Sequence, residues 1–179
     1  MEPVTPRVLE DFFTQLGQRS VKPARLYLLG GSALCLLGSP RTTVDVDLDL
    51  ELPLQDEAQF ETLINELAQE MRLDVEKVPL AEFAPLAPDA DKRHRFLASY
   101  GPIDVYIFDL YSMALSKIAR GFDSDLEDVI FLLNQELIDF DTLRSAFVGV
   151  LPKARRADID PREFQAYFDE IMRRFGALP

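Results

Sequence analysis

The stretch of sequence that decides the fold covers residues 26–48 and reads LYLLGGSALCLLGSPRTTVDVDL. It begins with a short apolar run of strand length, which ends abruptly in Gly30-Gly31. Ser32 then opens a short helix, and from residue 44 to residue 52 apolar and acidic residues alternate strictly. Such alternation is typical of a strand with one apolar and one acidic face. The stretch therefore predicts a strand, a turn, a helix and a second strand in succession.

The acidic face of the second strand carries Asp45 and Asp47. Residues two apart on a strand share a face, so the two carboxylates lie close together and repel each other unless a cation intervenes. Mg2+ or Mn2+ prefers oxygen ligands and also binds nucleotide phosphates, so the pair indicates a metal site for phosphoryl chemistry. The alternative is an edge strand with a solvated acidic face, which Asp49 and Glu51 favour because they continue the alternation.

The glycine turn before the acidic strand favours the metal interpretation. Glycines allow backbone amides to approach an anion, and the start of the following helix carries partial positive charge. Arg41 lies between the turn and the acidic pair and can neutralise phosphate charge. We therefore expect Gly30–Ser32 to bind phosphates beside a metal ion.

The rest of the chain predicts further elements around this unit. Apolar residues at helical spacing predict a first helix from Thr5 to about Arg19 and another helix around residues 60–67. Apolar runs predict strands at residues 73–78, 93–100 and 103–108, of which the last two form a hairpin.

After residue 110 every apolar pattern has the helical period. The expected fold is therefore α+β, with a mixed sheet and interspersed helices. Residues 1–110 are expected to form the α/β core, and residues 111–179 a helical C-terminal region packed on it as one compact unit.

Composition limits the functional classes. A chain of 179 residues with 47% hydrophobic content buries one sizeable core. Its longest apolar stretch, Leu26 to Gly38, is too short and too interrupted to cross a bilayer, and the N-terminal residues lack the pattern of a signal peptide. We therefore expect a cytoplasmic protein. With Cys35 as the single cysteine and His94 as the single histidine, thiol and Ser-His-Asp catalysis are disfavoured.

The formal net charge of −12 argues against a general nucleic-acid coat, because phosphate contacts require a positive field. The imbalance is uneven: residues 1–140 carry 12 basic and 25 acidic side chains, whereas residues 141–179 carry 7 basic and 6 acidic ones. The C-terminal part can therefore tolerate a polyanion, and a solvated helical surface is the alternative. The candidate polyanion-binding residues are Lys153, Arg155, Arg156, Arg162, Arg173 and Arg174.

The motif built from these residues is Gly30-Gly31-Ser32-Ala33, then Gly38, then Arg41-x-Thr43-x-Asp45-x-Asp47-Leu48. It resembles the nucleotidyltransferase superfamily that includes DNA polymerase beta, whose motif is Gly-Ser, roughly ten residues, then Asp-x-Asp. Within that superfamily it looks like the bacterial branch of abortive-infection and toxin-antitoxin nucleotidyltransferases. The resemblance assigns nucleotide binding to Gly30, Gly31, Ser32, Arg41, Thr43, Lys117 and Asp125.

The resemblance also implies a third carboxylate on a later strand. Asp104 stands alone among the apolar residues of the segment 103–107, so it is expected to join Asp45 and Asp47 as a metal ligand or base. The alternative is a polar residue at the end of a hairpin.

Lys117 lies off the apolar stripe of its helix and is therefore expected to be free to point at a site. The resemblance implies that it contacts the phosphates of the nucleotide, and that Asp125 or Asp128 orients it or caps the next helix. A surface lysine is the alternative.

The activity that the resemblance implies is Mg2+-dependent transfer of a nucleoside monophosphate from an NTP to a hydroxyl of an RNA, such as a tRNA 3′ end, or of a protein. The acidic pair holds the metal, the glycine turn binds the phosphates, Asp104 activates the acceptor, and Lys117 stabilises the departing pyrophosphate. A toxin-antitoxin role with a cognate toxin or antitoxin partner accompanies this expectation. The alternatives are a non-catalytic nucleotide-binding or partner-binding module on the same fold, and a metal-dependent phosphodiesterase.

Overall fold

The computed structural model describes residues 3–80 and 85–176. These residues form two compact units. The first contains residues 3–80 and 94–108, and the second contains residues 85–93 and 109–176. The sequence places the boundary at residue 110, and the structure places it two residues earlier. It also assigns residues 85–93, which were expected in the α/β core, to the helical unit.

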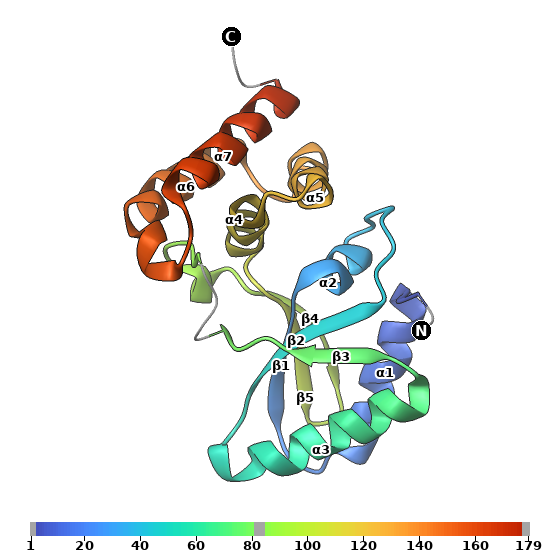
Figure 1. Ribbon diagram of the computed structural model, residues 1–179. Coiled ribbons are helices and arrows are strands. Elements are labelled where there is room, and N and C mark those ends of the chain that lie inside the picture. The colour runs from blue at the N-terminus through green and yellow to red at the C-terminus, as the bar shows by residue number, and fades with distance from the viewer. Residues whose placement is uncertain (1–2, 81–84, 177–179) are drawn as a thin grey trace. The chain divides into compact units, whose positions relative to one another are not determined.

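The first unit is built on a five-stranded sheet (Figure 1). Its strands are β1 (Ala24–Leu28), β2 (Asp45–Glu51), β3 (Asp74–Lys77), β4 (Arg95–Tyr100) and β5 (Ile103–Ile107). Their order is β3-β2-β1-β5-β4, with β1/β5 and β2/β3 parallel and β1/β2 and β4/β5 antiparallel. This mixed sheet with helices confirms the predicted α+β fold, including the hairpin of β4 and β5.

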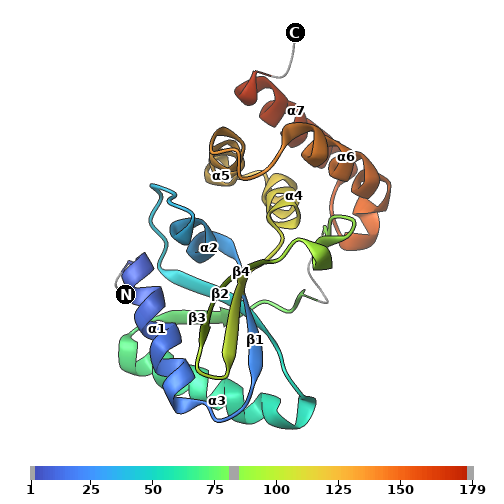
Figure 2. The ribbon, with the colours of Figure 1, turned by 180° about the vertical axis from the view of Figure 1, so that it is seen from behind.

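Helices α1 (Pro6–Arg19) and α3 (Leu54–Met71) lie side by side next to the sheet, as both ribbon views show (Figures 1 and 2). The hydroxyl of Thr5 accepts a hydrogen bond from the Val8 amide at 3.2 Å and so caps α1, as its sequence position predicts. The apolar stripes of both helices are buried together with alternate side chains of the strands. The buried stripe and strand residues include Leu9, Phe12, Leu16, Phe60, Leu67, Leu26, Leu28, Val46, Leu48 and Val105.

The second unit contains four α-helices: α4 (Leu110–Arg120), α5 (Asp123–Asn134), α6 (Phe140–Val150) and α7 (Pro161–Phe175). Two 3-10 helices, η2 (Ala90–Lys92) and η3 (Leu151–Ala157), complete it. The ring of Phe147 stacks on Phe168 at 4.0 Å between centroids and meets Phe164 edge-on at 4.7 Å, so α6 and α7 share an aromatic core.

Residues 85–93 are held to α4 by an ion pair. The Arg93 guanidinium donates to both carboxylate oxygens of Asp109, at 2.8 and 2.9 Å, and Asp109 in turn caps α4 by accepting from the Ser112 amide. Asp109 is fully buried, so this bidentate contact satisfies a charge that is costly to bury alone. It explains why the segment belongs to the helical unit.

No described helix is both long enough and apolar enough to span a membrane.

Candidate functional site

The glycine turn lies where β1 ends and helix α2 (Gly30–Leu36) begins. Gly30 has φ +58°, a backbone conformation that glycine adopts without strain. The sequence predicts that this helix starts at Ser32. In the structure it starts two residues earlier, at Gly30. Leu29 precedes the helix, and no side chain of the described residues caps it. The Leu29 amide donates to the Asp47 carbonyl at 2.9 Å, which ties the turn to β2.

Asp47 lies directly against this turn. A β-carbon built on Gly30 would be 1.8 Å from the Asp47 Oδ2 atom, so the carboxylate occupies the space that any other side chain would need. Asp47 is half-buried, and Asp45, two residues before it on the same face of β2, is exposed. The structure thus brings together the glycine turn and the acidic pair, which the sequence predicts to be one site.

The other two acids on this face of β2 have structural partners. The Leu80 amide donates to Asp49 Oδ2 at 2.8 Å, and the Tyr27 hydroxyl donates to Glu51 at 2.5 Å. Burial, followed by this hydrogen bond to Glu51, raises the pKa of Tyr27 to about 12. Strand β2 also lies between β1 and β3, so the alternative is wrong in taking it for an edge strand. Its acidic face is exposed at Asp45 and Glu51 and half-buried at Asp47 and Asp49.

Asp104 lies elsewhere on the sheet. On β5 it pairs with Arg25 of β1, and Arg25 pairs with Glu51 of β2, so Asp104 is in line with Glu51. Asp47 is four residues from Glu51, which is about 13 Å along the strand. The Ser99 hydroxyl donates to Asp104 Oδ1 at 2.5 Å. The expectation that Asp104 joins the acidic pair is therefore wrong, because the register of β1 and β5 takes it to the opposite end.

No three His, Cys, Asp or Glu side chains within residues 3–80 and 85–176 are grouped so as to hold a metal ion. This agrees with the position of Asp104 and leaves Asp45 and Asp47 as the two carboxylates beside the turn.

The side chains of Ser32 and Thr43 pack on the turn, whereas that of Arg41 is exposed. Ser32 is fully buried, and its hydroxyl donates to the Leu29 carbonyl at 2.9 Å, so its side chain is not exposed at the turn. A β-carbon on Gly31 would lie 2.9 Å from Thr43 Cβ and Oγ1, so Thr43 packs closely on the turn. Arg41 is exposed, and its contact with a phosphate stays a prediction.

Lys117 is buried, with 4% of its surface exposed, and lies in the helical unit. Its Nζ atom donates to Asp128 at 2.7 Å and to Asp125 at 3.3 Å, and Arg120 donates to Asp125 at 2.6 Å. The expectation of a free lysine is wrong, because the face of α4 beside its apolar stripe packs against α5 rather than facing solvent. Asp125 Oδ2 has no hydrogen-bond partner among the described residues.

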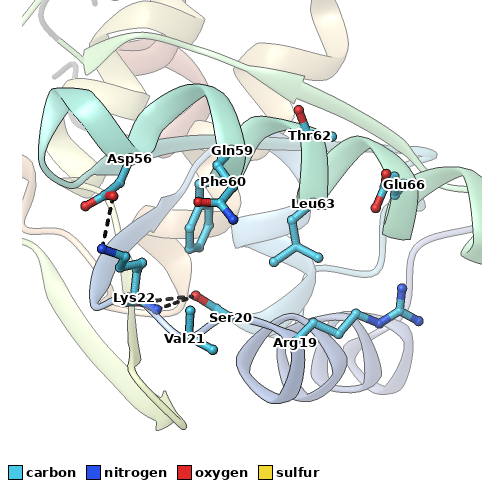
Figure 3. Close-up of a pocket in the computed structure, with 10 residues that line it drawn as sticks. All are labelled: Arg19, Ser20, Val21, Lys22, Asp56, Gln59, Phe60, Thr62, Leu63 and Glu66. Carbon is cyan, nitrogen blue, oxygen red and sulfur yellow. Dashed lines mark hydrogen bonds and ion pairs between the residues drawn. The ribbon is translucent and has the colours of Figure 1, made fainter.

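A separate hollow of about 340 Å3 lies in the first unit between the end of α1 and α3 (Figure 3). Phe60, Leu63 and Val21 contribute apolar surface, and the Lys22 ammonium pairs with Asp56 at 3.3 Å at its rim. Because Val21 precedes β1 and the glycine turn follows it, the hollow lies at the opposite end of that strand. It is not part of the acidic site.

The comparisons with known proteins agree with the fold. Residues 8–175 match the model of a family described as "Nucleotidyltransferase of unknown function (DUF6036)". The chain belongs to this nucleotidyltransferase family. Its fold is also similar to the crystal structure of an antigenic nucleotidyltransferase-like protein from Paracoccidioides brasiliensis, with a TM-score of 0.53 and 16% identity over 92% of this chain and 95% of that one. No curated protein matches the chain significantly.

The glycine turn and the acidic pair both lie within the residues that match this family. Sequence reasoning found Gly30, Gly31, Asp45 and Asp47, which the structure brings together. It did not single out Leu29, whose backbone amide joins the turn to β2. An apolar residue that acts through its backbone leaves no signal in the sequence.

Proposed function

We propose that the protein is a Mg2+-dependent nucleotidyltransferase that moves a nucleoside monophosphate from an NTP to a hydroxyl of an RNA, such as a tRNA 3′ end, or of a protein. The observation that carries the proposal is the contact of the Asp47 carboxylate with Gly30. It combines, at one point of the fold, a helix start that attracts phosphate and a carboxylate that attracts a cation.

The acidic pair fits Mg2+. This ion keeps several waters in proteins and is held by one or two carboxylates together with substrate phosphates, so Asp45 and Asp47 suffice as protein ligands. The exposed position of Asp45 leaves room for a triphosphate on the solvent side. When bound, Mg2+ would neutralise phosphate charge as it develops during transfer.

The chain's own residues contribute positioning. The backbone of Gly30–Ser32 would hold the phosphates at the start of α2, and Arg41 would add positive charge from the loop before β2. The acceptor oxygen then forms a bond to the α-phosphorus, the bond from that phosphorus to the bridging oxygen of the β-phosphate breaks, and pyrophosphate leaves. The acceptor hydroxyl gives its proton to solvent.

Lys117 and Asp125 have a structural role in this proposal. Their buried ion pair joins α4 to α5, and removing either partner would leave a buried charge without its counterion there. Nucleotide contact is therefore assigned to the first unit alone.

The finer features of the proposal rest on the resemblance of the motif at residues 30–48 to the bacterial branch of the superfamily. They are membership of the abortive-infection and toxin-antitoxin branch, a cognate protein partner and a cytoplasmic location. Each stays a prediction.

Transfer of label from an α-labelled NTP tests the proposal. Wild-type protein with Mg2+ is expected to label tRNA or a protein acceptor, and an Asp45→Asn/Asp47→Asn variant is expected to lose the labelling. Glu51→Gln is the matched control, because Glu51 lies on the same face of β2 but at the far end. No labelling by the wild type, or equal labelling by wild type and the double variant, would contradict the proposal.

A non-catalytic nucleotide-binding module is the second candidate. It is favoured by the position of Asp104, which leaves two carboxylates at the turn, and by the burial of Lys117. For this candidate, NTP binding depends on Asp47 and no transfer follows with any acceptor. Binding and labelling measured on the same preparation therefore separate the two functions.

A further inference from the structure

The exposed cations of this protein fall into two groups. Those of the first group are paired with carboxylates of the fold; examples are Arg19 with Glu70 and Arg144 with Asp141. Arg173 and Arg174, which the sequence offers as polyanion-binding candidates, belong to this group because both donate to Glu170. They lower the pKa of Glu170 to about 2 through these hydrogen bonds. Arg174 also donates to Asp123 at 2.6 Å, so two carboxylates compensate the two charges.

The other polyanion candidates make no side-chain hydrogen bond or ion pair with any described residue. They lie within ten residues of one another on η3 and at the start of α7. They are Lys153, Arg155, Arg156 and Arg162. In a chain with a formal net charge of −12, four uncompensated cations in one segment form a local positive site.

The geometry of η3 turns its three cations, Lys153, Arg155 and Arg156, outward. A 3-10 helix has three residues per turn, so Leu151, Ala154 and Ala157 share one face. Ala154 is buried, and the other two are half-buried. Lys153 and Arg156, one turn apart, therefore lie together on an exposed face, and Arg155 occupies the remaining exposed face.

Arg155 faces the start of α7. Together with Arg162 it lines a hollow of about 570 Å3, which Asp158 and Asp160 also line. Asp160 caps α7 by accepting from the Arg162 amide at 2.8 Å, so this carboxylate has a structural task. Residues 151–162 still carry four cations against two carboxylates.

The position of Arg162 brings no benefit to the helix. It lies in the first turn of α7, where the helix dipole favours acidic side chains and opposes a cation. A cation at this place, unpaired and beside three others, is placed well for a ligand that brings negative charge from outside.

We propose that the segment 153–162 binds the phosphate backbone of an RNA acceptor. The inference rests on the proposed function, because RNA is one of the two acceptor classes named there. Guanidinium groups bind phosphate in bidentate geometry, and three of the four cations are arginines. A membrane-binding amphipathic helix carries an apolar face beside its cations, whereas the apolar residues of η3 turn inward, which favours RNA over an anionic membrane.

Binding of unfractionated tRNA, measured by filter retention over a range of salt concentrations, tests this inference. A Lys153→Gln/Arg155→Gln/Arg156→Gln variant is expected to bind at least tenfold more weakly than wild type. The slope of log affinity against log salt should fall by about 2, at about 0.7–0.9 per lost phosphate contact. An Arg155→Gln/Arg162→Gln variant, which leaves two cations in place, is expected to lose less.

The matched control removes the same number of charges from paired positions: Arg19→Gln/Lys92→Gln/Arg144→Gln. It should retain tRNA affinity within twofold. Equal losses in both triple variants, no binding by wild type, or loss of binding to phosphatidylserine vesicles without loss of tRNA binding would each overturn the inference.

The acidic pair separates this inference from the proposed function. An Asp45→Asn/Asp47→Asn protein is expected to bind tRNA at least as tightly as wild type, because it loses no cation of the segment. Segment-dependent tRNA binding without any transfer by wild type would sink the proposed chemistry and leave the RNA site standing. Transfer to tRNA by wild type with unchanged tRNA binding in the segment variant would do the reverse.

Discussion

The carboxylate of Asp47 fills the space where a side chain on Gly30 would lie, with 1.8 Å between Oδ2 and an ideal β-carbon. The relationship joins the first residue of α2 to one on β2 that is seventeen positions later in the sequence. It makes glycine obligatory at the turn for two reasons, the positive φ and the carboxylate. The two reasons can be separated by substitution.

Gly30→Ala is expected to destabilise the protein by more than the roughly 1–2 kcal/mol that a left-handed backbone costs an L-residue, because the new methyl group also displaces Asp47. Gly38→Ala is the control, since Gly38 has φ +87° and a β-carbon built on it would have no atom of the described residues within 4 Å apart from its chain neighbours. Urea unfolding of both variants measures the difference. In a Gly30→Ala/Asp47→Ala double variant the loss should be smaller than the sum of the single losses. Strict additivity would contradict the contact.

Asp104→Asn is expected to leave the affinity for an Mg2+–NTP complex within twofold of wild type, because the strand register takes Asp104 away from the turn. Asp47→Asn should lower the same affinity at least tenfold. Calorimetric titration of both variants gives the comparison. Equal losses in the two variants would show that Asp104 does serve the metal site.

Lys117→Met is expected to lower the free energy of unfolding by about 3–5 kcal/mol, because it removes the buried ammonium that pairs with Asp128 and Asp125 and leaves Arg120 to pair with Asp125. Arg144→Met, which breaks an exposed pair with Asp141, should cost at most about 1 kcal/mol. Chemical denaturation followed by circular dichroism measures both. A loss in Lys117→Met no greater than that of the control would refute the buried network.

Tyr27 is expected to be the tyrosine whose titration reaches the highest pH, since burial and the hydrogen bond to Glu51 raise its pKa to about 12. The folded protein holds this proton more tightly than the unfolded chain. The stability from this group is therefore fully present below about pH 10, the ordinary tyrosine value, and is lost as the pH rises through about 12.

Ultraviolet absorbance of the phenolate follows this titration in wild type and in Tyr27→Phe. The variant should lack the transition at highest pH and keep the others among the five tyrosines. A wild-type curve from which Tyr27→Phe removes only an ordinary transition near pH 10 would be inconsistent with the buried hydrogen bond.

Local patterns were sufficient for most of the fold. Alternation in residues 44–52 and the glycines at 30 and 31 reflect short-range geometry, so β2 and the turn before it follow from the sequence. The sequence predicts a helical region after residue 110 but gives α6 no bounds of its own. Leu143, Ala146, Phe147 and Val150 nevertheless form a buried stripe after the capping residue Asp139. Here the signal was present in the sequence.

The register between strands that are distant in the sequence could not be predicted. The composition of the segment 103–107 suits a strand with one acid, but its position along β1 decides where Asp104 lies, and pairing of distant strands is not encoded locally. The prediction of a free Lys117 is wrong for a related reason. Its own helix places it off the apolar stripe, and the carboxylates that it pairs with come from α5. Periodicity describes one helix, not its neighbour.

Binding of Mn2+ together with an NTP, detected as loss of the paramagnetic resonance signal of free Mn2+, tests the central claim most directly. Wild type and Glu51→Gln are expected to bind the metal–nucleotide complex with the same affinity. Asp45→Asn/Asp47→Asn is expected to bind it at least tenfold more weakly, because the two carboxylates beside Gly30 are removed. Unchanged binding by the double variant would contradict a metal–nucleotide site at this turn.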